Sequence, residues 1–148
     1  MVEIKGGDKL EAALAKIAKN VTKAAAVDVG FLEDATYPDG TSVAMVAAIQ
    51  EFGAPNAGIP PRPFFRGMIQ EKSPQWPQAI ATQLKETEYD AEKTLGRMGE
   101  GIKGQLQDAI VDFNSVPLSP VTVAKKGNDK QLVDTGHMLR SADYRVKT

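Results

Sequence analysis

One segment near the end of the chain decides the fold: Leu132-Val133-Asp134-Thr135-Gly136-His137-Met138-Leu139-Arg140-Ser141. The short oxygen-bearing side chains of Asp134 and Thr135 can hydrogen-bond the backbone at a turn or at a helix start. Gly136 tolerates a positive φ, and the apolar residues after His137 can anchor one helical turn. Apolar and charged residues then alternate over 143–148, which predicts an amphipathic strand. We therefore expect the chain to end inside its own sheet.

The same segment offers an alternative of another class, a hydrolase built on Asp134. Its Leu-Val-Asp-Thr-Gly sequence is similar to the strand and loop that carry the catalytic Asp of retroviral-type aspartic proteases. That chemistry needs two carboxylates that share a proton, which a dimer could supply. It also needs a flap and further strands, and only 12 residues follow Gly136. The spacing therefore favours a turn, and we expect no catalytic residues.

Composition fits one ordinary globular domain over residues 1–148. The chain is 42% apolar and 25% charged, and its net charge of −1 gives no general attraction to nucleic acid or to a membrane. It has no cysteine and one histidine, so we expect no disulfide, no metal site and no cofactor. No window is apolar enough to span a membrane, and the first residues do not form a signal peptide.

Periodicity predicts the helices and strands. Apolar residues at three- and four-residue steps indicate helices over 8–25, 43–52 and about 90–113, and two shorter helical segments begin near Pro63 and Ser73. Alternation predicts a strand over 26–32. The predicted fold class is α+β: a small antiparallel-rich sheet that includes the C-terminal strand, packed against several amphipathic helices, with long projecting loops. We expect the helices at 8–25 and 90–113 to cover that sheet.

The long helix contains four glycines, at positions 96, 99, 101 and 104. Each costs helix stability, about 1 kcal/mol relative to alanine, so we expect them to allow close approach of another backbone. A phosphate-binding loop is the alternative. The glycines are not followed by the Gly-Lys-Ser/Thr that such a loop requires, and they lie within an amphipathic pattern.

Three stretches together resemble the neck and tail-completion proteins of tailed bacteriophages, the virion-morphogenesis families. The first is AAIQEFG at 47–53, which leads into IPPRPFFR at 59–66. The second is PLSPVTVAKKG at 117–127, and the third is the segment at 132–141 with its terminal strand. Their order and spacing agree with those families over about residues 8–148.

The resemblance implies a small α+β subunit of the virion, without catalytic residues, that joins head to tail as a homo-oligomeric ring. Its partners would be further copies of itself and the adjoining connector and tail proteins. DNA would pass through the channel without specific binding, and no membrane would be involved. A tail terminator ring that caps the tail tube is the alternative within this class. A small nucleic-acid-binding module is disfavoured by the net charge.

Three loops, at 33–41, 53–62 and 115–131, are long or stiffened by proline, which lowers the cost of ordering on binding. Residues 119–148 carry a net charge of +3 and the remainder −4, a division that suits contact between complementary surfaces. Aromatic residues and arginine are typical interface anchors, and the alternative, which the pattern favours for at least one of Phe64 and Phe65, is a place in the core. The predicted interface residues are Phe64, Phe65, Arg66, Lys125, Lys126 and Lys130.

Overall fold

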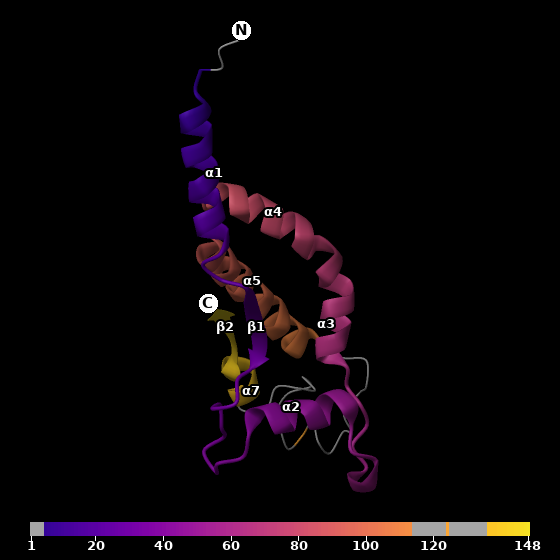
Figure 1. Ribbon diagram of the computed structural model, residues 1–148. Coiled ribbons are helices and arrows are strands. Elements are labelled where there is room, and N and C mark those ends of the chain that lie inside the picture. The colour runs from indigo at the N-terminus through magenta and orange to yellow at the C-terminus, as the bar shows by residue number, and fades with distance from the viewer. Residues whose placement is uncertain (1–4, 114–123, 125–135) are drawn as a thin grey trace.

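The computed structural model describes residues 5–113, 124 and 136–148 (Figure 1). Strands β1 (Ala26–Phe31) and β2 (Ala142–Lys147) form a two-stranded antiparallel sheet. Ala26 pairs with Lys147, and Phe31 pairs with Ala142. The predicted terminal strand and its place in an antiparallel sheet are therefore confirmed.

Gly136 determines how the chain enters β2. It adopts φ 72°, the left-handed conformation expected of it, and directly precedes the short helix α7 (His137–Ser141). The Ser141 hydroxyl donates to the carbonyl of His137 at 2.8 Å, and the backbone then becomes extended at Ala142. Gly136, the single helical turn and the final strand therefore follow each other as the sequence predicts.

Helix α5 (Ala91–Asp112) is the central element and covers one face of the sheet (Figure 1). It begins at Asp90, whose side chain accepts a hydrogen bond from the backbone N–H of Lys93 at 3.1 Å. This cap satisfies one of the amide groups that a helix start leaves unpaired. The one-sided apolar pattern of α5 thus has the sheet as its partner, as predicted.

The remaining chain folds around the other sides of α5. Helix α2 (Val43–Phe52) is capped by Ser42, and a 3-10 turn at Pro55–Ala57 follows it. Helix α3 (Phe64–Lys72) starts directly after Pro63, and a second 3-10 turn, Ser73–Gln75, leads into α4 (Trp76–Glu86). These starts match the predicted helix over 43–52 and the predicted helical segments that begin near Pro63 and Ser73.

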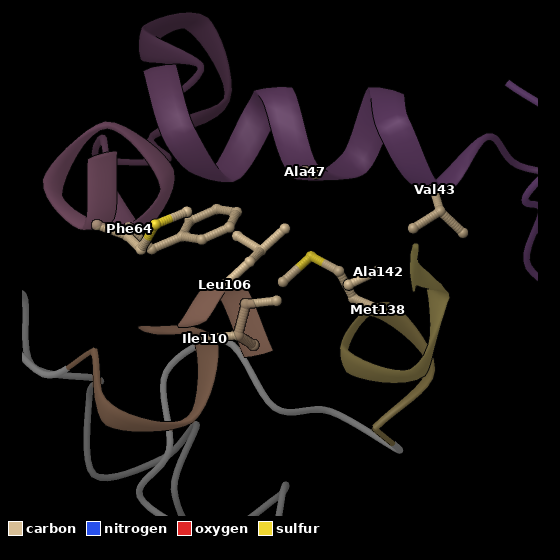
Figure 2. Packing of buried hydrophobic residues seen from close by; sticks show 8 residues of the cluster. Val43, Ala47, Phe64, Leu106, Ile110, Met138 and Ala142 are labelled. Atoms are coloured by element: carbon tan, nitrogen blue, oxygen red, sulfur yellow. The ribbon is translucent and has the colours of Figure 1, made fainter. Parts of the chain in front are cut away.

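The main core lies where α2, α3, α5 and α7 meet (Figure 2). The figure shows side chains of α5 reaching between α2 and α7, with Phe64 of α3 beside them. Leu106 and Ile110 of α5 are completely buried. The buried cluster consists of Val43, Ala47, Phe64, Met68, Leu106, Ile110, Met138 and Ala142.

Helix α1 (Gly7–Val21) does not cover the sheet, and this prediction was wrong. None of its residues is buried, and Figure 1 shows it projecting beyond the end of the sheet. Leu10 and Leu14 remain 62% and 56% exposed. Helix α1 is amphipathic as expected, but its apolar face does not pack on the sheet, and α5 provides the helical cover instead.

The prediction that the glycines of α5 allow close approach of another backbone also needs correction. A Cβ on Gly99 would lie 2.5 Å from the Tyr144 ring and 2.9 Å from Val27, so Gly99 does allow close approach. The group that approaches it is a side chain, not a backbone. At Gly96, Gly101 and Gly104 a Cβ would meet no atom within 4 Å in the described part of the chain. Among the described residues, only Gly99 therefore allows close approach, and none of the four glycines admits another backbone as predicted.

Candidate subunit interface

The predicted anchor Phe64 is a core residue and cannot contact a neighbouring subunit. It is only 2% exposed and packs edge-on against Phe31 of β1, with the ring centroids 6.4 Å apart. Phe65 is half-buried against Gly30, and Arg66 is exposed. A helix that starts at Phe64 presents successive side chains on different sides, so these three residues cannot share one environment.

A buried carboxylate, which the sequence reasoning missed, fixes the start of α3. One oxygen of Glu51 accepts from the backbone N–H of Phe65 at 3.0 Å. The other accepts from the backbone N–H of Arg66 at 3.1 Å and from its Nε at 2.7 Å. Pro63 provides no side-chain cap, so Glu51 of α2 performs that role from another element. The available signal was a lone charge within the otherwise uncharged 43–52 helix.

The 53–62 loop folds back on α2 rather than projecting freely. Gly53 has φ 75°, and a Cβ there would lie 2.8 Å from the Ile59 carbonyl oxygen. Ala54 and Ile59 form a bridge, and the N–H of Arg62 donates to the Gln50 carbonyl at 2.7 Å. The loop is thus held at both ends by backbone hydrogen bonds, in addition to the stiffness expected from its prolines.

An apolar surface remains exposed on α2, and we call it the α2 patch: Met45, Ala48 and Phe52, with Arg66 at its edge. Phe52 is 64% exposed, and the guanidinium of Arg66 lies 4.8 Å from the centre of its ring. A shallow hollow of about 240 Å³ adjoins it and is lined mainly by Phe31, Ala44, Ala47, Ala48, Phe52 and Phe65. Exposed aromatic and arginine side chains beside an apolar hollow are typical of protein–protein interfaces.

A second apolar surface, the α1 stripe, consists of Leu10, Leu14, Ile17 and Val21. These residues recur at steps of three and four, so they lie on one face of α1. Three of them are among the most exposed large apolar residues of the described chain, and Ile17 is half-buried. A water-exposed stripe of this length stabilises nothing in an isolated subunit.

Polar contacts attach α1 to the rest of the molecule. Lys16 forms an ion pair with Glu88 at 3.2 Å, and the Asn20 side chain donates to the Glu88 carbonyl. Lys23, just beyond the helix, pairs with Asp90 at 2.7 Å. Glu88 and its neighbour Tyr89 both have positive φ, an uncommon conformation for residues with side chains. These contacts therefore involve a strained connection between α4 and α5.

The hydrogen bond from Lys23, together with the N–H of Lys93, lowers the pKa of Asp90 below its ordinary value. Asp39 shows a similar lowering of its pKa, because the N–H of Thr41 donates to it in the tight turn before α2. In both cases the partner is a neighbouring backbone or ammonium group with a structural role. Neither shift therefore indicates a catalytic acid or base.

Several predicted residues lie outside the described part of the chain. They are Lys125, Lys126 and Lys130 of the basic loop, and Asp134 of the protease-like motif. Within residues 5–113, 124 and 136–148, no group of three acidic or histidine side chains could hold a metal ion. Across those same residues, no helix has both the length and the apolar character needed to cross a membrane.

No protein-family model, curated protein or solved structure matches this chain.

Proposed function

We infer that this chain is a structural subunit of a tailed bacteriophage, which forms a ring at the head–tail junction and joins head to tail. One structural observation supports an assembly role above all: the subunit exposes two apolar surfaces, the α1 stripe and the α2 patch. Surfaces of this kind on a small protein are typical of interfaces with other chains. The resemblance of residues 47–66, 117–127 and 132–141 to neck and tail-completion families supplies the phage assignment.

The role of the site is to bind, and we propose no catalytic step. Glu51 fixes the start of α3, and its bond from the Nε of Arg66 holds the Arg66 guanidinium over the ring of Phe52. The 53–62 loop is already hydrogen-bonded to α2, so little chain needs to become ordered on docking. The proposed partners are further copies of this chain and the adjoining connector and tail proteins, with DNA passing through the ring.

A complementation assay tests this function. Extracts of phage that lack this chain are mixed with the purified protein, and infectious particles are counted. We expect the wild-type protein to restore particle yield by orders of magnitude. The variant F52E should restore much less, and the matched variant A81E, on exposed α4, should act as wild type. Full particle yield without the protein would contradict the proposal.

Electron microscopy of the same extracts separates the two positions of the ring. If this chain is a neck protein, extracts that lack it contain filled heads and tails of normal length that remain separate. If it is the alternative tail terminator, they contain tails of irregular length.

The basic loop can be tested in parallel with K125E/K126E, which should join heads to tails poorly and fold normally. Wild-type joining by that variant would remove the loop from the interface.

A further inference from the structure

The orientation of α1 leaves most of its apolar stripe exposed, to one side of the edge that contacts the subunit. Lys16, Asn20 and Lys23 follow each other at steps of four and three, so they define one edge of the helix and its extension. That polar edge makes the contacts with Glu88 and Asp90. Each residue of a helix adds a rotation of about 100°, and on that basis the middle of the α1 stripe lies about 120° around the helix from this edge. Attachment by the polar edge therefore positions the stripe for another chain.

The α2 patch is too far away for α1 of the same subunit to reach it. Figure 1 shows α1 and α2 at opposite ends of the molecule, with the sheet and α5 between them. A contact between stripe and patch must therefore join two copies. Such a contact uses different surfaces on the two partners, and repetition of it generates a ring or a filament.

The two surfaces match in chemistry. Between Ser42 and Pro61 the only charged residue is Glu51, and it is buried, so α2 presents an uncharged surface. Its small residues Ala44 and Ala48 lie beside the larger Met45 and Phe52. Leucine side chains spaced like Leu10 and Leu14 can fit between such residues, as knobs fit into holes in helix packing.

Charges at the margins also agree. The polar edge that holds α1 to its own subunit carries the lysines, and Glu11 lies on the opposite margin of the stripe. Arg66 is the exposed cation at the edge of the α2 patch. A neighbouring α1 laid on the patch can therefore bring Glu11 towards Arg66 while its lysines remain with its own Glu88 and Asp90.

We propose that α1 of each copy docks through its stripe, Leu10, Leu14, Ile17 and Val21, onto the α2 patch of the next copy. This inference rests on the proposed function, because it specifies how the ring closes. The partner is a second copy of this chain, and the arrangement is head-to-tail. Each subunit thus gives one helix and receives one.

A mixing experiment tests the head-to-tail arrangement. L14E removes the donor surface and F52E removes the acceptor surface; A12E, on the far side of α1, and A81E are the matched charge controls. Sedimentation velocity should show concentration-dependent assembly of the wild type and both controls. L14E and F52E should each assemble at least tenfold more weakly. An equimolar mixture of the two should form heterodimers and nothing larger, because only one donor and one acceptor remain.

Two results would overturn the proposal. If F52E assembles as the wild type does while L14E does not, α1 pairs with another α1 or with a different surface. If the wild type remains monomeric at every concentration, this contact does not form between copies. Circular dichroism of each variant checks the fold, which should persist because Leu14 and Phe52 are mostly exposed.

Cross-linking gives a second, independent readout. The chain has no cysteine, so introduced cysteines are the only thiols present. L14C mixed with F52C should form a mixed disulfide dimer on oxidation, far faster than L14C alone or L14C mixed with A81C. Equal yields in all three mixtures would contradict the contact. Amide exchange in α1 should also slow when the wild type assembles.

Failure of this inference can be separated from failure of the proposed function. A protein that restores infectious particles but shows no L14C–F52C cross-link has the proposed function and a different ring contact. A protein that cross-links as expected but is dispensable for joining heads to tails has the contact and another function.

Discussion

At Gly99, the sheet comes closer to α5 than a side chain at that position would permit. The Tyr144 ring and Val27 occupy the space that a Cβ would need. We expect Gly99→Ala to destabilise the fold by about 1–3 kcal/mol, because overpacking must push the strand from the helix. Gly101→Ala should instead stabilise it by about 1 kcal/mol, since no atom of the described chain obstructs that position. Urea unfolding of both variants measures the difference, and equal signs would refute the packing argument.

Glu51 stabilises the fold through direct hydrogen bonds to the first residues of α3. Glu51→Ala leaves the backbone N–H groups of Phe65 and Arg66 without their partner, and we expect a loss of about 2–3 kcal/mol. Glu51→Gln keeps one acceptor oxygen and should lose about half as much. Arg66→Ala removes the cation beside a buried carboxylate but leaves both backbone donors in place, so it should cost about 1–2 kcal/mol, less than Glu51→Ala. Chemical denaturation orders the three variants, and an Arg66 effect as large as that of Glu51→Ala would contradict this assignment.

At the scale of elements, periodicity identified most helices and both strands correctly, because each reflects a local pattern. The error over α1 has a physical cause. The spacing of Leu10, Leu14 and Val21 indicates that one face of the helix is apolar and is stabilised by burial. It does not specify which surface buries that face. The charged residues between them do not reveal their partners either, and Lys16 and Lys23 hold the helix to the subunit. Glu51 was missed for a related reason, since its partners follow it by 14 and 15 residues.

The link between Lys23 and Asp90 makes the junction of α1 with α5 sensitive to pH. The pKa of Asp90 is lower in the folded chain than in the unfolded one, so its stabilising effect is fully present above the unfolded pKa of about 3.9. The effect is lost as the pH falls through the lower folded value. Asp90→Asn should therefore lower the thermal midpoint at pH 7 and approach the wild type in acid. The variant D108N is the charge control, and a difference that persists unchanged to pH 2 would contradict the assignment.

At the scale of the whole molecule, the candidate interface was predictable only in part. The sequence indicated a binding surface near Arg66 and the 53–62 loop, where the structure has the α2 patch. It misplaced Phe64, because an aromatic pair at a helix start does not reveal which ring points inward. The opposite placement of α1 and α2, on which the head-to-tail contact depends, is a product of the tertiary fold and has no local signature.

The pairing of β1 with β2 has a consequence for the speed of folding. Phe31 meets Ala142, so the sheet joins segments with most of the chain between them, and the entropy of closing that loop is lost before any contact is gained. We expect the helices to form early and the strands to meet late. Val146→Ala should then speed unfolding while leaving the refolding rate nearly unchanged in stopped-flow experiments. Refolding slowed by the full loss in stability would show that the strands meet first. With late pairing, the rate-limiting barrier is crossed while β2 is still unpaired, and the sheet chiefly governs how long a finished subunit stays folded.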